Sequence, residues 1–335
     1  MKLRILSESD CRAVLDMATA IDVQSEAFTL LAQRQSVEGL RRMATSEDPP
    51  GVAIFNPCFL RGGKGYGIKV ISDFYDNDKR GVVRMSGLVC LFDGLTGHPH
   101  TVLEAGYLTD LRTGAGTGLA ARYLARRDSR VLTIIGAGRV ARNQLAALAE
   151  VFDLETVFLC TRSPARANDF IERISSAGSR IPKDIQLVES REDAVGNSDI
   201  VVVATTSEAP VFSGAWLRAG TFVASVGAYE ATTREVDSET IRRASNWVID
   251  SRTDCLDHAG DFVIPIGEGL IRREQIAEIA EVASGARPCR QSDQEITYYK
   301  SIGVPIQDLV TAQHMARRAA QRGIGVEIDI GGDVG

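Results

Sequence analysis

The sequence has few of the features that mark exported, membrane-bound or nucleic-acid-binding proteins. Among its 335 residues are only 6 cysteines and 4 histidines, and the cysteines stand singly, without the spacing of disulfide frameworks or zinc sites. Its longest apolar runs are strand-sized, whereas a membrane span needs roughly 20 residues, and no apolar signal core follows the first residues. Acidic residues outnumber basic ones by 44 to 38, and nucleic-acid binding needs clustered lysine and arginine. We therefore expect a cytoplasmic protein without a metal site and without a nucleic-acid or membrane partner.

What is present is the composition of a globular protein, 44% hydrophobic and 24% charged, with a length that suits about two domains. Residues 1–35 have a helical pattern, with Ser7 and Asp10 spaced as a capping box. Short β-rich runs bounded by Gly, Pro, Asn and Asp follow, which predicts an antiparallel region over residues 50–108. These runs are residues 52–55, 66–71, 82–84, 87–92 and 100–103.

The second part of the chain alternates between helix-length segments and apolar runs. A helix is predicted over residues 113–127, and a last helix over residues 306–322, ended by Gly323. Strands buried on both faces of a parallel sheet are apolar throughout. The fold class expected is therefore α/β, with a doubly wound, Rossmann-type parallel sheet beside a second α+β domain. The apolar runs are residues 131–135, 157–160, 200–204, 222–226 and 247–250.

A glycine-rich loop follows the first of these parallel strands. Residues 131–141 read V-L-T-I-I-G-A-G-R-V-A, so G-x-G-x-x-A lies between a strand and a helix. Gly136 permits the tight turn, Gly138 lets a pyrophosphate approach the backbone, and the helix N-terminus supplies N–H donors and a positive dipole. This pattern predicts a dinucleotide site. Its expected contacts are Gly136, Ala137, Gly138, Arg139 and Val140.

The end of the second parallel strand bears on the choice between NAD and NADP. An NAD site places an acidic residue there, roughly 20 residues after the glycines, on the ribose 2′-hydroxyl. Here the strand is followed by Thr161, Arg162 and Ser163, with Arg166 beyond. A cation and hydroxyl donors suit a 2′-phosphate, so we expect NADP(H) to be preferred, with NAD(H) possible. The loops after two further strands complete the expected cofactor site with Thr205, Thr206, Val226 and Gly227.

Two segments carry cations in apolar or small surroundings. Residues 67–71, G-I-K-V-I, contain Lys69, and residues 108–115, L-T-D-L-R-T-G-A, contain Arg112. Together with the glycine loop and a late block at 292–308, S-D-Q-E-I-T-Y-Y-K-S-I-G-V-P-I-Q-D, they resemble the ornithine cyclodeaminase/mu-crystallin family over nearly the whole chain.

This resemblance implies a domain organisation. Members of the family combine a Rossmann domain with a domain that is made from both termini and mediates dimerisation through its β-rich part. We accordingly expect residues 1–114 and 306–335 to form the substrate and dimer domain, and residues 115–305 to form the dinucleotide domain. The expected assembly is a homodimer.

The resemblance also assigns roles to single residues. Lys69 and Arg112 match the family's carboxylate-binding pair, and Asp308 matches a position close to nicotinamide and substrate, so these three are the expected catalytic residues. Arg42 is the candidate third cation. A guanidinium binds a carboxylate bidentately, and a lysine can also move a proton to or from nitrogen.

Two departures from the family pattern bear on the substrate. Tyr229 stands where most members have an Asp that contacts the substrate nitrogen, and Asn56 stands at a position that varies with substrate. Neither side chain holds an ammonium as a carboxylate does. We therefore expect hydride transfer between nicotinamide and the α-carbon of an imino acid/amino acid pair, as in an imine or ketimine reductase or an amino-acid dehydrogenase. The alternatives are an ornithine or lysine cyclodeaminase, which releases ammonia with NAD as catalytic cofactor, and an NADPH-dependent small-molecule binder like mu-crystallin.

Overall fold

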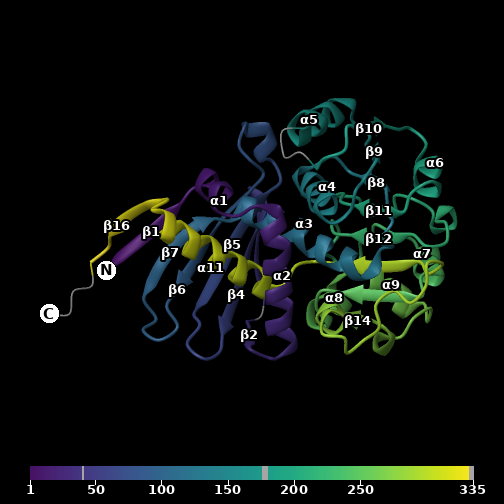
Figure 1. Ribbon diagram of the computed structural model, residues 1–335. Helices are drawn as coiled ribbons and strands as arrows, with labels where there is room; N and C mark the ends of the chain where they lie inside the picture. The colour runs from purple at the N-terminus through teal and green to yellow at the C-terminus, as the bar shows by residue number, and fades with distance from the viewer. Residues whose placement is uncertain (40, 176–179, 332–335) are drawn as a thin grey trace. The chain divides into compact units, whose positions relative to one another are not determined.

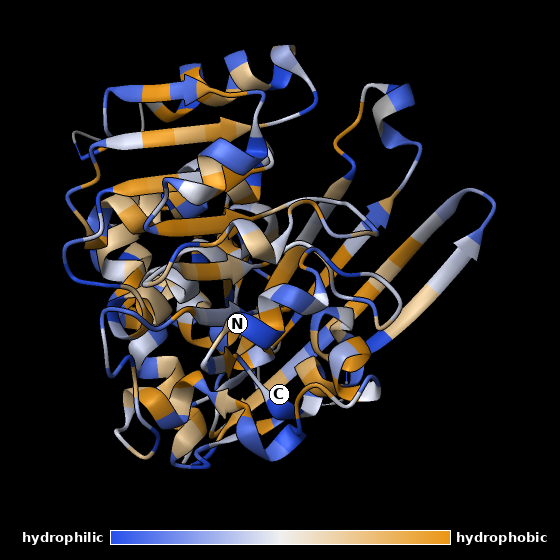
Figure 2. Ribbon diagram, turned by 90° about the vertical axis from the view of Figure 1, so that its right-hand side faces the viewer, coloured by the Kyte–Doolittle hydropathy of each residue, from blue (hydrophilic) through white to orange (hydrophobic). Residues whose placement is uncertain are grey.

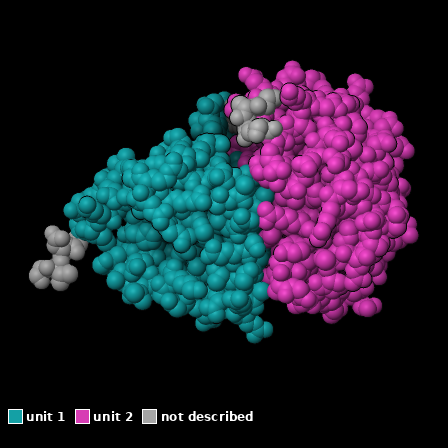
Figure 3. Space-filling model, viewed as in Figure 1, with its two compact units in different colours: residues 1–112, 305–335 teal, residues 113–304 magenta. Residues whose placement is uncertain are grey.

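The computed structural model describes residues 1–39, 41–175 and 180–331, and the chain forms two compact units (Figure 3). Unit 1 comprises Met1–Arg112 and Pro305–Gly335, and unit 2 comprises Thr113–Val304. The boundaries predicted from the sequence, after residues 114 and 305, lie close to these.

Unit 1 is built on an eight-stranded sheet with the order β16-β1-β7-β6-β5-β4-β2, and β3 pairs with β4. The pairs from β4 to β7 are antiparallel, as predicted, whereas β1 runs parallel to β7. Helix α11 packs on α2 and on the sheet across β4, β5 and β6 (Figure 1). The strands are β1 (Lys2–Leu6), β2 (Ser36–Glu38), β3 (Arg42–Glu47), β4 (Pro50–Leu60), β5 (Tyr66–Phe74), β6 (Met85–Phe92), β7 (Pro99–Glu104) and β16 (Val326–Asp329); the helices are α1 (Glu8–Val14), α2 (Met17–Ala32), the 3₁₀ turn η1 (Asn77–Arg80), the first part of α3 (Ala105–Leu124), and α11 (Pro305–Arg322).

Three predictions for this unit were wrong in detail. Residues 2–6 form β1 instead of helix. This strand was not predicted because its partners β7 and β16 are distant in sequence and leave no local signal. The capping box of Ser7 and Asp10 is present and begins α1. Residues 82–84 form no strand. Helix α3 begins at Ala105, well before residue 113, because the carboxylate of Glu104 accepts hydrogen bonds from the N–H groups of Gly106 and Tyr107.

Unit 2 is a doubly wound parallel sheet with the order β10-β9-β8-β11-β12-β15-β13-β14, and each neighbouring pair is parallel. The chain starts at β8, moves outward to β9 and β10, and returns to the other side of β8 at β11. This reversal is the position where such sheets bind dinucleotides. The strands are β8 (Val131–Ile135), β9 (Thr156–Cys160), β10 (Asp184–Leu187), β11 (Ile200–Val203), β12 (Phe222–Ser225), β13 (Asn246–Ile249), β14 (Ala277–Glu278) and β15 (Thr297–Lys300).

Helices and short turns connect these strands: α4 (Arg139–Val151), α5 (Pro164–Ser175), α6 (Arg191–Gly196), η2 (Gly214–Trp216), α7 (Ser238–Arg243), α8 (Arg252–His258), α9 (Gly260–Gly267), η3 (Arg273–Gln275) and α10 (Ile279–Ala283). Each residue of β11, β12 and β15 is buried, and several strands are coloured mainly as hydrophobic in Figure 2. The five predicted apolar runs coincide with β8, β9, β11, β12 and β13. The Rossmann-type fold class is thereby confirmed.

Candidate functional site

Three charged side chains from distant parts of the sequence meet in unit 1. Lys69 lies on β5, Arg112 on α3, and Asp308 in the first turn of α11. Nζ of Lys69 is 2.6 Å from Oδ2 of Asp308, and Nε of Arg112 donates to Oδ1 of Asp308 at 2.9 Å. Their exposed fractions are only 3%, 6% and 3%. The structure thus brings together the three residues predicted to be catalytic.

The alternation of β5 explains why a lysine is buried here. Gly67, Lys69 and Ile71 point to the face covered by α11, whereas the residues between them are half-buried on the other face. A Cβ on Gly67 would lie 3.1 Å from Leu309 Cδ1, so the glycine lets α11 approach closely. A buried charge is costly unless it is paired and hydrogen-bonded, and Asp308 on this helix supplies the partner.

Burial and pairing shift the pKa values of this cluster. Burial lowers the pKa of Lys69 from 10.5 to about 8; the nearby Asp308 opposes this shift, and the positive charge of Arg112 adds to it. The pKa of Asp308 is lowered, since the ion pairs with Lys69 and Arg112 outweigh the opposing effect of its burial. A lysine that titrates near neutral pH beside a fixed guanidinium can both hold an anion and exchange a proton.

Arg41 is a further cation near Lys69. Asn56 on β4 lies directly opposite Lys69 on β5, is buried, and accepts a hydrogen bond from Nε of Arg41 at 3.3 Å. Arg42, the residue named from the sequence, is exposed on β3 and pairs with Phe55 of β4. Because paired residues share a face and neighbours in a strand alternate, Arg42 lies on the face away from Asn56. Sequence reasoning could not separate the two adjacent arginines.

The glycine loop has the geometry that a pyrophosphate requires. Gly136 has φ +117°, and a Cβ there would lie 2.2 Å from Ala204 O, so only glycine fits this turn. Gly138 is the N-cap of α4 and forms no side-chain cap, and a Cβ on it would meet nothing within 4 Å. Backbone N–H groups at the start of a helix without a side-chain cap suit an anion. Ala137, Arg139 and Val140 belong to this loop and to the first turn of α4.

The loop after β9 carries no carboxylate through residue 166. Thr161 Oγ1 accepts from Ser163 N, and Ser163 Oγ accepts from Arg166 N, both at 3.3 Å. Arg162 and Arg166 are exposed. The loop therefore presents hydroxyl groups and cations where an NAD site would have an acid.

The loops after β11 and β12 hold the remaining predicted residues, Thr205, Thr206, Val226, Gly227 and Tyr229. Both loops are tied to Glu235, a residue that sequence reasoning missed. Thr205 donates to it from N and Oγ1, at 2.8 and 2.9 Å, and Gly227 N donates at 2.6 Å. Thr206 is exposed, whereas Val226 and Tyr229 are half-buried. No local motif marks Glu235, because its partners come from two other loops.

Over residues 1–39, 41–175 and 180–331, no three His, Cys, Asp or Glu side chains are grouped to hold a metal ion. In the same described ranges, no helix combines the length and apolar character needed to cross a membrane.

Comparison with known proteins finds relatives that match nearly the whole chain. It is 31% identical over 326 residues to a Δ1-pyrroline-2-carboxylate reductase of Bacillus cereus, covering 97% of this chain and 99% of that protein. A solved Δ1-pyrroline-2-carboxylate reductase of Thermococcus litoralis, in complex with NADH and L-proline, superposes with a TM-score of 0.91 at 36% identity, covering 97% of this chain and 100% of that one. An archaeal alanine dehydrogenase dimer with bound NAD superposes with a TM-score of 0.90 at 30% identity, covering 99% of this chain and 100% of that one.

The sequence profile of one family spans both units. It matches residues 1–323, which include Lys69, Arg112, the glycine loop and Asp308. The resemblance noted from the motifs is confirmed, and the chain belongs to the ornithine cyclodeaminase/mu-crystallin family.

Proposed function

We propose that this protein is an NAD(P)-dependent oxidoreductase that transfers a hydride between nicotinamide and the α-carbon of an imino acid/amino acid pair, acting as an imine reductase in the reductive direction. The observation that carries the proposal is the buried cluster of Lys69, Arg112 and Asp308, in which two cations converge on one carboxylate. The reductases and the dehydrogenase to which the chain is similar support the same reaction class.

In this proposal Arg112 binds the substrate carboxylate. Asp308 engages Nε of Arg112, and the paired Nη atoms of a guanidinium can hold a second carboxylate bidentately. Asn56 and Arg41, linked by their hydrogen bond, flank Lys69, and we assign to Arg41 the role first expected of Arg42. A fixed carboxylate orients the α-carbon, which lowers the entropic cost of reaching the transition state.

Lys69 is the proposed proton donor. A bound nicotinamide dinucleotide would supply the hydride for the C=N carbon, and the imine nitrogen would need one proton to become an amine. Lys69 in its ammonium form can deliver that proton, since its pKa of about 8 leaves it protonated at neutral pH yet easily deprotonated. Asp308 keeps the ammonium form available by opposing the effect of burial.

The neutral residues Asn56 and Tyr229 favour a reductase over a cyclodeaminase. Cyclodeamination of ornithine or lysine requires a group that holds a distal ammonium, and an amide or a phenol is a poor substitute for a carboxylate there. We therefore expect a substrate without a distal cation.

For the cofactor, the chain's similarity to structures with NADH and NAD supports a nicotinamide dinucleotide. We propose that NADP(H) is preferred, because Arg162 and Arg166 with the hydroxyls of Thr161 and Ser163 follow β9 in place of an acid. The glycine loop from Gly136 would hold the pyrophosphate.

We also propose a homodimer formed through the face of the unit 1 sheet opposite α11. This face carries exposed apolar side chains, including Phe59 at 41%, Leu88 at 52% and Val326 at 63%, and a stack of Phe59, Tyr66 and Phe92. An antiparallel sheet that faces water on one side normally alternates apolar and polar residues, so a face this apolar indicates a partner. The occupant proposed is a second copy, which the similarity to an alanine dehydrogenase solved as a dimer supports. We retain the cytoplasmic location, which the six free cysteines support.

A spectrophotometric screen tests the reaction. Purified protein is mixed with NADPH or NADH and with a cyclic imino acid such as Δ1-pyrroline-2-carboxylate, or with a 2-oxo acid plus ammonia or methylamine. Oxidation of the reduced nicotinamide with formation of the amino acid is expected. Conversion of ornithine to proline and ammonia without net change of a catalytic amount of NAD would instead identify a cyclodeaminase. Tight dinucleotide and ligand binding without any turnover would identify a binder.

A further inference from the structure

Unit 2 contains a second cluster of charged side chains that is fully buried. Glu235, Asp261 and Lys300 each have an exposed fraction of 0%. Nζ of Lys300, at the end of β15, lies 2.8 Å from Oδ2 of Asp261 on α9 and 3.8 Å from Oε2 of Glu235. Removing three charges from water is costly, and the ion pairs of Lys300 with the two carboxylates offset part of that cost.

The carboxylate of Glu235 joins the loops that follow two adjacent parallel strands. Oε1 accepts from N and Oγ1 of Thr205, after β11, and Oε2 accepts from N of Gly227 at 2.6 Å and N of Ala228 at 3.1 Å, after β12. A Cβ on Gly227 would lie 2.1 Å from Thr205 O and 2.5 Å from Oε1 of Glu235. The two loops are therefore in backbone contact, with one carboxylate satisfying donors from both.

The backbone of Glu235 is fixed as well. Oδ1 of Asp261 accepts from the N–H groups of Glu235 and Val236 at 2.9 and 3.0 Å, while Oδ2 pairs with Lys300. Asp261 thus holds the main chain of Glu235, and Lys300 lies between the two carboxylates. All four hydrogen bonds to the carboxylate of Glu235 come from N–H or O–H donors, which suits a group that can only accept.

The strand order assigns these loops to one half of a dinucleotide. β9 and β11 lie on opposite sides of β8, whose loop carries Gly138. In a Rossmann sheet the pyrophosphate lies at this loop and the adenosine ribose reaches the end of the second strand, here β9. The nicotinamide half then extends to the other side, toward the ends of β11 and β12.

We propose that Glu235, held by Lys300 and Asp261, is a positioning residue that sets the β11 and β12 loops for the nicotinamide half of the bound dinucleotide. The proposal rests on the proposed function. In this role Glu235 acts through its hydrogen bonds to Thr205, Gly227 and Ala228.

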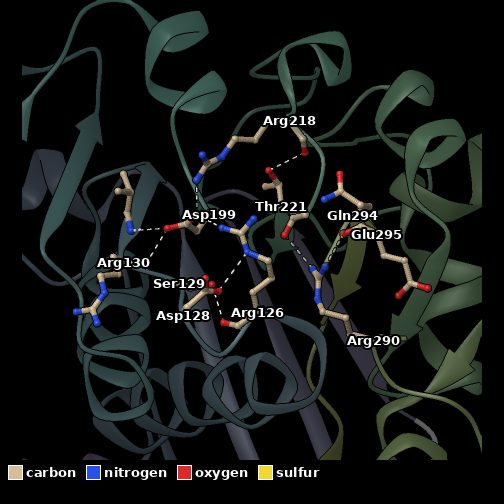
Figure 4. Close-up of polar contacts among 12 residues, drawn as sticks. Arg126, Asp128, Ser129, Arg130, Asp199, Arg218, Thr221, Arg290, Gln294 and Glu295 are labelled. Carbon is tan, nitrogen blue, oxygen red and sulfur yellow. Dashed lines mark hydrogen bonds and ion pairs between the residues drawn. The ribbon is translucent and has the colours of Figure 1, made fainter. Parts of the chain in front are cut away.

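The opposite edge of the same sheet offers a matched control. The carboxylate of Asp199, just before β11, accepts from the N–H groups of Arg130 and Val131 at 2.8 and 2.9 Å and pairs with Arg126 and Arg218 (Figure 4). Like Glu235 it is a buried carboxylate that ties several segments together. Its loops lie at the amino ends of the strands, away from the edge that binds dinucleotides.

The experiment compares Glu235→Gln with Asp199→Asn in the full chain. Calorimetry gives the Kd of NADPH and of adenosine 2′,5′-bisphosphate, which is the adenosine half alone; NADH and ADP form the equivalent pair. Glu235→Gln places an amide NH₂ against N–H donors, so we expect the Kd of the dinucleotide to rise by about tenfold, or 1.4 kcal/mol, and that of the adenosine half to change by less than about twofold. Asp199→Asn should lower Tm and change both Kd values by less than about twofold.

A merely structural role would give a different pattern. The positioning role is contradicted if Tm falls as in Asp199→Asn while Glu235→Gln raises the Kd of the dinucleotide and of the adenosine half equally, or raises neither Kd. Should Glu235→Gln not fold, Asp261→Asn takes its place. This variant is expected to raise the Kd of the dinucleotide, by less than the tenfold expected of Glu235→Gln, and to leave the Kd of the adenosine half unchanged. An equal change of both Kd values in Asp261→Asn also contradicts the proposal. Wild-type protein that binds neither NADPH nor NADH would overturn the proposed function, and the inference with it, whereas the variant results bear on the inference alone.

Discussion

Lys69 and Asp308 form a buried ion pair, with 2.6 Å between Nζ and Oδ2, although most of the chain separates them in sequence. The pair joins the central strand β5 to the first turn of α11. Since burial lowers the pKa of Lys69 and Asp308 opposes that shift, the pair places the lysine's titration within the range of ordinary assays.

Reductive turnover should decline as the pH rises through about 8, where Lys69 loses its proton. The ammonium form predominates below this pKa and is the proton donor, so kcat/KM should be level at lower pH and fall by about tenfold per pH unit above it. Asp308→Asn removes the charge that raises the pKa of Lys69, so the decline should then begin at lower pH. Lys69→Arg retains a cation that does not deprotonate, and an unchanged inflection in this variant would contradict the assignment.

Arg112→Ala should lower kcat/KM by about 100-fold, corresponding to loss of about 3 kcal/mol from a buried charge-assisted contact. Arg112→Lys should recover only part of this activity, because an ammonium cannot bind a carboxylate bidentately. Steady-state kinetics with the imino acid provide the measurement.

The same kinetic assay distinguishes the roles of Arg41 and Arg42. Arg41→Ala should raise KM for the imino acid by about tenfold, since it removes the hydrogen bond to Asn56 and a cation near Lys69. Arg42→Ala, exposed on the other side of β3, should change KM by less than about twofold. The reverse result would restore the role expected of Arg42 from the sequence.

Alanine at the two loop glycines should have opposite effects. Gly138→Ala adds a Cβ that, apart from the adjoining residues, meets nothing within 4 Å in the part of the chain that the structure describes. Tm should therefore change little while the Kd of NADPH rises by about tenfold. Gly136→Ala brings a Cβ to 2.2 Å from Ala204 O at φ +117°, and should destabilise the fold by about 2 kcal/mol or more. Thermal unfolding and dinucleotide titration distinguish them. Normal NADPH binding by Gly138→Ala would be evidence against the predicted pyrophosphate position.

Arg162→Ala should raise KM for NADPH by about tenfold and leave KM for NADH within about twofold, because only the former has a 2′-phosphate. Arg173, an exposed arginine of α5 that pairs with Asp169, provides the control, and Arg173→Ala should leave both constants unchanged. If Arg162→Ala does not alter KM for NADPH, the proposed preference for NADP(H) is wrong.

Leu88→Glu should convert the proposed dimer to a monomer, as measured by light scattering after size-exclusion chromatography. Leu88 is 52% exposed on the apolar face of the unit 1 sheet, and an interface core does not tolerate a buried, unpaired carboxylate. Leu187, 45% exposed on β10 of unit 2, provides the comparison, and Leu187→Glu should remain dimeric. A monomeric wild-type protein would refute the dimer itself.

The fold could be predicted from sequence where the signal is local. The apolar run of β8 and the glycines that follow it place a strand, a turn and a helix in order, because side-chain period and glycine conformation depend on neighbouring residues. β1 and β16 could not be found in this way, since they pair across the length of the chain, and neither could the start of α3, which the cap by Glu104 decides.

For the site, the amino-acid sequence determined which residue types were available: Lys69, Arg112 and Asp308 in recognisable motifs, and no acid among residues 161–166, directly after β9. Only the tertiary structure decided that the Asp308 carboxylate pairs with both Lys69 and Arg112. It also decided that Arg41 and not Arg42 contacts Asn56, and that Glu235 binds the loops after β11 and β12. The reason is physical: motifs record constraints between neighbours along the chain, whereas burial and ion pairing arise from contacts between segments that are adjacent only after the chain has packed.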